Sequence, residues 1–309
     1  MKESPKIPSY KFKASKADKA EIGFEIFTLN SLFSRYDKLK SQLEKPHRVE
    51  FYLILFITKG TGRHFIDFQQ YKYHKGNILF ISKGQVHAFE VLPESDGFLI
   101  LFTEVFLSKN LIHSDILSLY RIYNYHLHLP ILQPEETGDN DFIGIINAMH
   151  EEYNSSNTFA KEEILRLLLK LLLLRAERVK HTLIPQGKSS ESFVKFGAFR
   201  NLLENHFTRT RNAKEYAGMM NISYKYLNEI CKSVTGSTAK KFIDNFVILE
   251  IKRRLATSDL SVKELTYELG FDEPTNLLKY FKKHTLQTPS QFKELIIKSL
   301  IGSTFTILL

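Results

Sequence analysis

A stretch near the C-terminal end carries polar side chains on one predicted helix face, in types suited to binding nucleic acid. Within residues 212–232, apolar Leu227, Ile230 and Cys231 recur at positions i, i+3 and i+4, which predicts a buried stripe. The other face carries Tyr224, Lys225, Asn228 and Lys232. Lysine amines pair with phosphate oxygens, and an asparagine amide matches the edge of adenine.

A second stretch, residues 261–283, repeats this arrangement. Ser261 followed by Glu264 predicts a capping box at the start of a helix, and Gly270 predicts its end. Pro274 suits the first turn of the next helix, where its missing N–H has no intrahelical partner. The predicted inner face consists of Leu277, Tyr280 and Phe281, and the predicted outer face of Thr275, Lys279, Lys282 and Lys283.

Both stretches are therefore predicted to be helix-turn-helix units, with Ser223 as the N-cap of the second helix in the first unit. Residues 238–257 connect the units without Gly or Pro, and predict a helix of about 30 Å, close to the roughly 34 Å between successive turns of one major groove. Each unit alone is equally explained as a helical hairpin in a bundle. Two units, a rigid connector and a net charge of +9 favour double-stranded DNA as the partner.

The last third of the chain resembles the DNA-binding domain of the AraC/XylS family of transcription regulators. The matching motifs lie at residues 223–228, 232–236, 250–255, 269–271, 279–283 and 288–292. The resemblance implies base-groove contacts from Lys225, Asn228 and Glu229 in the first recognition helix, and from Pro274, Thr275 and Lys279 in the second. The Glu229 carboxylate could accept from a cytosine amino group, with an ordinary surface charge as the alternative. We assign Lys282 and Lys283 to phosphates.

Three positions depart from the family pattern. Leu286 stands where the family usually has glycine, and Arg254 replaces a leucine. Pro274 offers neither a polar side chain nor a backbone N–H. These departures predict that the second recognition helix contacts fewer bases than the first.

The front part of the chain has a β-rich residue pattern, unlike the helical pattern of the last third. Six short β-rich runs lie between residues 51 and 102, separated by glycines, which predicts an antiparallel sandwich or barrel. This pattern resembles the cupin-like sensor barrel that precedes such DNA-binding domains, and helical spacing follows in residues 104–180. The expected fold class is therefore α+β, an N-terminal cupin-like β-barrel with a helical extension and a C-terminal all-α domain with two helix-turn-helix units. We expect domains at 1–180 and 193–297, a linker at 181–192 and a tail at 298–309.

The front domain offers candidate binding residues but an incomplete metal site. Only His47, Glu50 and His87 fall near the places of cupin metal ligands, and the usual His-x-His pair is missing because position 49 is valine. We therefore expect no metal and no cofactor. The candidates for an effector pocket are His47, Phe51, Phe80, His87 and Phe89, with a purely structural role in the barrel as the alternative.

The remaining expectations concern partners and location. Residues 160–179 form a predicted helix that is apolar around most of its circumference, which favours a homodimer contact. The chain has one cysteine, no export signal and no apolar run long enough to span a bilayer, so we expect a cytoplasmic protein without a membrane partner. The favoured function is an effector-controlled transcription regulator, not an enzyme, with RNA polymerase as a candidate partner. The alternatives are a ligand-independent dimeric regulator and, more remotely, a cupin metalloenzyme fused to a helical module.

Overall fold

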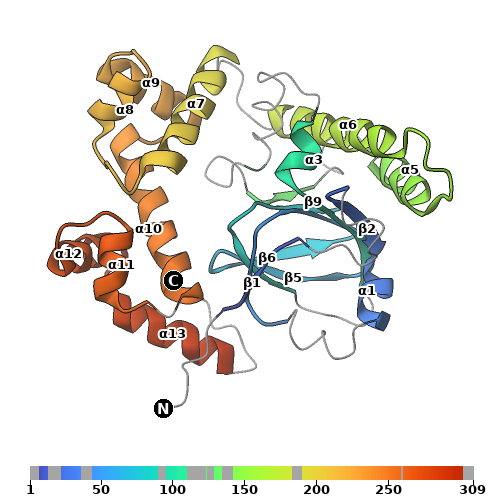
Figure 1. Cartoon of the computed structure of the whole chain (residues 1–309), viewed down its shortest axis with the longest axis horizontal. Helices are drawn as coiled ribbons and strands as arrows, with labels where there is room; N and C mark the ends of the chain where they lie inside the picture. Colours follow the sequence, from blue (N-terminus) through green and yellow to red (C-terminus); the bar gives the residue numbers. More distant parts are fainter. Residues whose placement is uncertain are drawn as a thin grey trace. The chain divides into compact units, whose positions relative to one another are not determined.

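The structure is a computed structural model of the 309-residue chain, and it describes residues 7–12, 22–35, 44–89, 95–109, 123, 129–133, 142–182, 190–258 and 260–301. The chain divides into two compact units (Figure 1). Residues 9–185 form the N-terminal unit, and residues 186–309 together with residues 1–8 form the C-terminal unit. Ile7 groups with the C-terminal unit, where its N–H donates to the Ala256 carbonyl at 3.1 Å.

The N-terminal unit contains two five-stranded sheets, in which all neighbouring strands are antiparallel except β1 and β3. The first sheet has the order β1 (Ser9–Tyr10), β3 (His47–Val49), β8 (Val86–Phe89), β5 (Thr61–Ile66) and β6 (Gln69–His74). The second has the order β10 (Ile131–Leu132), β7 (Ile78–Ile81), β4 (Tyr52–Lys59), β9 (Asp96–Phe102) and β2 (Phe24–Thr28). All six predicted runs are strands. Strands β1, β2, β3 and β10 lie outside the predicted runs. The two-residue strands β1 and β10 carry no pattern of their own, because only their hydrogen bonds to β3 and β7 define them.

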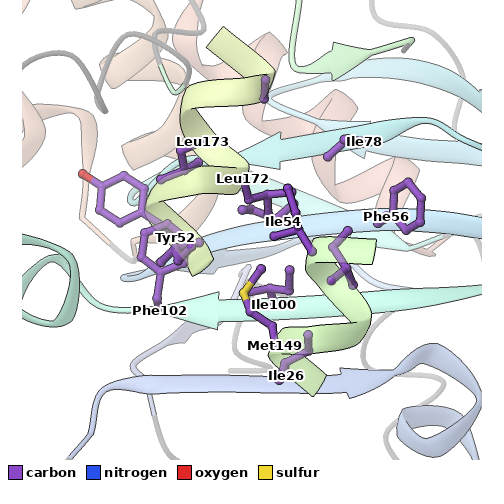
Figure 2. Packing of buried hydrophobic residues seen from close by; sticks show 14 of the residues in the cluster. Ile26, Tyr52, Ile54, Phe56, Ile78, Ile100, Phe102, Met149, Leu172 and Leu173 are labelled. Carbon is purple, nitrogen blue, oxygen red and sulfur yellow. The ribbon is translucent and has the colours of Figure 1, made fainter. Parts of the chain in front are cut away.

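Strand β4 shows why the unit has two hydrophobic cores. Its odd-numbered residues from Leu53 to Ile57 pack in one cluster with residues of both sheets, whereas Tyr52, Ile54 and Phe56 pack in a second cluster with the helices. A strand covered on both faces is apolar at successive positions, as β4 is from Tyr52 to Ile57. The helices α5 (Phe142–Asn154) and α6 (Lys161–Thr182) cover this outer face. Figure 2 shows Leu172 of α6 beside Ile54, and Met149 of α5 beside Ile100.

The predicted helical extension is present where the structure describes it. Besides α5 and α6, the short helices α1 (Leu29–Arg35) and α3 (Glu104–Ser108) belong to this unit. Residues 110–122, 124–128 and 134–141 of the predicted extension lie outside the described residues, as do residues 183–189 of the predicted linker. The end of that linker is helical instead, because α7 begins at Ser190 and Glu191 forms an ion pair with Lys195 one turn later, at 2.6 Å.

The C-terminal unit is helical in all its described elements, which agrees with the predicted α+β class. They are α7 (Ser190–His206), α8 (Ala213–Met219), α9 (Tyr224–Thr235), α10 (Ala239–Thr257), α11 (Val262–Glu268), α12 (Pro274–Thr285) and α13 (Pro289–Ile301). Helix α13 runs beyond residue 298, where the tail was expected to begin, and residues 302–309 lie outside the described part.

Candidate nucleic-acid interface

The first helix-turn-helix unit consists of α8 and α9, and local side-chain caps determine where both helices start. The Asn212 side chain accepts from the Lys214 N–H at 3.0 Å, and the Ser223 hydroxyl accepts from the Tyr226 N–H at 3.1 Å. Asn221 supplies the turn with a φ of +53°, a left-handed conformation that asparagine tolerates. The predicted stripe is confirmed, since Leu227, Ile230 and Cys231 are all buried.

Burial of that stripe leaves the opposite face of α9 in solvent. Tyr224, Lys225, Glu229 and Lys232 are exposed, as predicted. Asn228 is only half-buried, and its Oδ1 accepts a hydrogen bond from the Ala239 N–H at 3.0 Å. Asn228 therefore holds the first turn of α10, a role that the sequence did not indicate.

The second unit consists of α11 and α12. The capping box of Ser261 and Glu264 is present, and it lowers the pKa of the Glu264 carboxyl because the Ser261 hydroxyl and N–H both donate to it. Gly270 has a φ of +70°, and Pro274 occupies the first turn of α12. The predicted outer residues Thr275, Lys279, Lys282 and Lys283 are exposed.

Tyr280 is only partly an inner residue of α12. Its ring is half-buried, and its hydroxyl donates to Asp244 Oδ1 on α10 at 2.7 Å. Burial and this nearby carboxylate both raise the pKa of the phenol, so Tyr280 is neutral at physiological pH. The hydrogen bond attaches the second recognition helix directly to the connecting helix.

The two recognition helices end in the same local structure. Thr235 at the end of α9 donates to the Cys231 carbonyl and accepts from the Ser237 N–H, both through its hydroxyl. Thr285 at the end of α12 makes the matching bonds to the Phe281 carbonyl and the Gln287 N–H. The residue after each threonine has a left-handed backbone, with a φ of +74° at Gly236 and +62° at Leu286. The units are therefore a structural repeat, in which Leu286 occupies a position that favours glycine.

In the N-terminal unit, three buried histidines lie together on neighbouring strands. His47, His64 and His87 come from β3, β5 and β8, with ring centroids 4.2 Å apart for His47 and His87 and 5.3 Å apart for His64 and His87. Burial lowers the pKa of His64 to about 3 and lowers the pKa of the other two as well. The sequence reasoning missed His64, whose place depends on the pairing of β5 with β8.

These histidines do not converge with other ligands on a metal position. Glu50 is exposed and accepts from the Ser9 hydroxyl at 3.1 Å. Within the described residues, no group of three or more His, Cys, Asp or Glu side chains has the arrangement to hold a metal ion.

The predicted effector-pocket residues are divided between two sides of a sheet. Phe51 and Phe89 belong to the core between the sheets, and Phe89 contacts the rings of His64 and His87. Phe80 packs in the other core, beneath α6, and thus on the opposite side of the sheet from Phe51 and Phe89. The reason is the two-residue period of β7, where Leu79 and Ile81 point between the sheets and Phe80 points to the helices.

Comparison with known proteins agrees with this arrangement. The family model described as an AraC-like ligand binding domain matches residues 39–169, and a helix-turn-helix domain model matches residues 216–294. The HTH-type transcriptional activator RhaS of Klebsiella pneumoniae is 23% identical over 253 residues, covering 80% of this chain and 87% of its own. RhaS of Escherichia coli O1:K1 is 22% identical with the same coverage. These relatives are transcription regulators.

Among solved structures, ToxT from Vibrio cholerae is similar at 14% identity and a TM-score of 0.43, with 88% of this chain and 98% of that chain covered. In the described part of the chain, none of the helices combines the length and apolar character needed to cross a membrane.

The matched models together cover both units at the places where the strands and the two helix-turn-helix units lie. The chain belongs to the AraC/XylS family of transcription regulators, with an N-terminal ligand-binding domain and a C-terminal helix-turn-helix DNA-binding domain.

Proposed function

We propose that α9 and α12 bind successive major-groove turns of one DNA duplex. The observation that carries this proposal is the structural repeat, since two like-capped helices flank a 19-residue connector, α10. A helix of that size is about 28 Å long, which is near the separation of neighbouring groove turns.

Side-chain chemistry divides the exposed residues into two groups. Lys225, Glu229, Thr275 and Lys279 lie in the first half of their helices and contact base edges. Tyr224, Lys232, Lys282 and Lys283 contact phosphates. Asn228 and Pro274 are half-buried, so each offers less to DNA than the family resemblance implies. Asn228 retains its amide donor for a base, because only its oxygen holds Ala239.

The experiment is a selection of duplexes from a random library by the full chain. The expected result is a motif with two base boxes separated by about one helical turn. A selection that enriches no sequence, or only a single short box, contradicts the two-groove proposal.

We also propose that the three histidines bind a neutral, hydroxyl-bearing effector. His64 Nε2 and His87 Nδ1 are 3.1 Å apart, so their mutual hydrogen bond uses one donor and one acceptor of two neutral rings. The opposite nitrogens, His64 Nδ1 and His87 Nε2, are buried without a hydrogen-bond partner in the described structure. One is a donor and the other an acceptor, and a hydroxyl group can pair with either.

A thermal-shift screen of the full chain with neutral hydroxylated metabolites and matched carboxylates tests this effector class. Stabilisation by a neutral compound, lost in His87→Phe but kept in Lys225→Ala, is the expected result. Stabilisation only by carboxylates contradicts it, and no stabilisation by either panel favours a ligand-independent regulator.

In keeping with relatives named activators, we propose that the protein raises transcription in the cytoplasm through contact with RNA polymerase.

We further propose that the protein is a homodimer, joined through α6. Its exposed face carries Ile164, Leu167, Leu171 and Leu174, each more than a third exposed, at the alternating spacing of three and four of a two-helix seam. Glu163 lies at one end of this stripe and Arg178 at the other, and both are exposed. In an antiparallel pair centred near Leu171, Glu163 of each copy lies opposite Arg178 of the other. Charge complementarity therefore favours a second copy of the chain as the occupant.

A further inference from the structure

Apart from the connection through α10, the loop that leads into the first helix-turn-helix unit touches the second unit directly. The contact joins the loop between α7 and α8, residues 207–212, to the turn between α11 and α12, residues 269–273. Arg211 donates from Nη2 to the Leu269 carbonyl, and its guanidinium lies 3.6 Å from the centre of the Phe271 ring. One arginine of the loop before the first unit thus holds both a backbone carbonyl and an aromatic ring in the turn of the second.

Gly270, between these two residues, permits the close approach. A Cβ atom at Gly270 would lie 1.6 Å from the Thr208 carbonyl oxygen, far inside contact distance. The backbones of loop and turn therefore pack with no side chain between them. Gly270 also has a left-handed φ, so two independent features of the turn depend on its being glycine.

Arginine is not the residue that stability alone would favour at this place. Arg211 Nε is buried and has no hydrogen-bond partner in the described part of the structure, and burial lowers the pKa of the guanidinium. A buried polar atom without a partner destabilises the fold, whereas an apolar side chain there would avoid that penalty. Arginine instead fixes the orientation of the turn relative to the loop, because its planar group bonds to the Leu269 carbonyl and stacks on Phe271 in one orientation.

The turn held by Arg211 leads directly into α12. Phe271 also contacts Tyr280 of that helix, with ring centroids 5.5 Å apart, and Tyr280 in turn bonds to Asp244 of α10. The second recognition helix is thereby attached at its start to the first unit and at its middle to the connector. Two attachments restrict rotation of one unit about α10 relative to the other.

We infer that Arg211 is a positioning residue that sets the base-pair spacing at which the two recognition helices bind together. The inference rests on the proposed two-groove binding. Each base pair added between the two boxes rotates the second box by about 34° around the duplex axis. A rigid pair of units discriminates against that rotation, and a loosely jointed pair does not.

The test is a set of duplexes that carry the selected boxes at the natural separation, at one base pair more or less, and as the first box alone. The full-length wild type is expected to prefer the natural separation by about tenfold. Arg211→Ala is expected to lose most of this preference and to keep its affinity for the single box. Arg211→Lys, which keeps the charge but not the planar group, is expected to fall between them.

Arg209→Ala is the matched control, because Arg209 is an exposed arginine on the same loop. It removes the same charge and is expected to leave the spacing preference intact. An unchanged preference in Arg211→Ala, or an equal loss of affinity on every duplex including the single box, overturns the inference. If the wild type itself selects no two-box motif, it is the proposed function that fails.

A second measurement does not depend on DNA. Spin labels at Glu229→Cys and Lys279→Cys report the distance between the two recognition helices. Cys231 does not compete for the label, because it is buried and burial raises the pKa of its thiol to about 12. A narrow distance distribution that broadens in Arg211→Ala but not in Arg209→Ala supports the inference, and equal widths in all three proteins contradict it.

Discussion

The Ala239 N–H donates to Oδ1 of Asn228 at 3.0 Å, joining the first recognition helix to the start of the connector. The structural repeat shows why this bond exists in one unit only. The position that matches Asn228 in α12 is Leu278, and the position that matches Ala239 in α13 is Pro289, which has no N–H to satisfy. Asn228, which the family resemblance suggests as a base-contact residue, thus also caps the start of α10.

Substitution of Asn228 separates these two roles. Asn228→Asp keeps an oxygen acceptor for Ala239 but removes the amide donor, so we expect wild-type stability with altered base preference at one position of the first box. Asn228→Ala loses both, and we expect about 1 kcal/mol lower unfolding free energy as well. Urea unfolding and binding to single-base variants of the box measure the two effects. An equal loss of affinity on matched and random duplexes for both variants would reject base contact by Asn228.

Leu286 is expected to destabilise the end of α12. Its φ of +62° is left-handed and its side chain is 87% exposed, so it carries backbone strain without compensating burial. We expect Leu286→Gly to raise the unfolding free energy by about 0.5–1 kcal/mol after allowing for the freedom of glycine in the unfolded chain. Gly236→Ala at the matching position is the control and should lower it. Stability that falls in Leu286→Gly would show that the leucine has packing partners in solution.

Lys282 tests the assignment to phosphate. It is exposed in the last turn of α12. Lys282→Ala is expected to weaken binding to all duplexes alike and to reduce the slope of log K against log salt by about 1. Lys263→Ala, on α11, is the control for loss of charge. Sequence-dependent losses in Lys282→Ala would instead place this lysine at a base edge.

The buried histidines predict a loss of stability at mildly acid pH. His64 has a pKa of about 3 in the fold against 6.5 unfolded, so below pH 6.5 the unfolded chain binds the proton and the native protein does not. Stability is therefore full above pH 6.5 and falls as the pH drops toward 3. Between pH 7.5 and 5.5, His64 alone is expected to account for about 1.4 kcal/mol. Urea unfolding at both pH values should show a smaller decrease in His64→Gln than in the wild type, and equal decreases would contradict it.

Charge reversal on α6 tests the antiparallel dimer. Glu163→Lys and Arg178→Glu each place like charges opposite one another twice across the twofold axis, and each is expected to weaken the dimer by about tenfold. The double variant restores opposite charges and should recover wild-type affinity. Sedimentation of the wild type, the two single variants and the double variant in the analytical ultracentrifuge compares their dimer affinities. A double variant weaker than both single variants excludes this register.

Much of the C-terminal unit could be predicted from the sequence, because local interactions determine where its helices start. Ser223, the Ser261 and Glu264 box and Pro274 act within one helical turn of their own positions, so their pattern predicts the helix starts that the structure shows. The apolar stripe of α9 was equally readable, because a 3.6-residue period assigns burial without knowledge of the partner. The β-rich runs between residues 51 and 102 were readable from their own residue types and from the glycines that separate them, which are also local signals.

Only the tertiary structure decided which distant residues meet. His64 joins His87 through strand pairing, Phe80 turns away from both, and Arg211 reaches Leu269 across 58 positions of sequence. No local period encodes these contacts, since they depend on how whole elements pack. The sequence by itself thus determined that the chain carries two DNA-binding units behind a β-rich domain. The fold decided that Asn228 is a cap, that three histidines share one buried site, and that Arg211 and Gly270 join the loop before the first unit to the turn of the second.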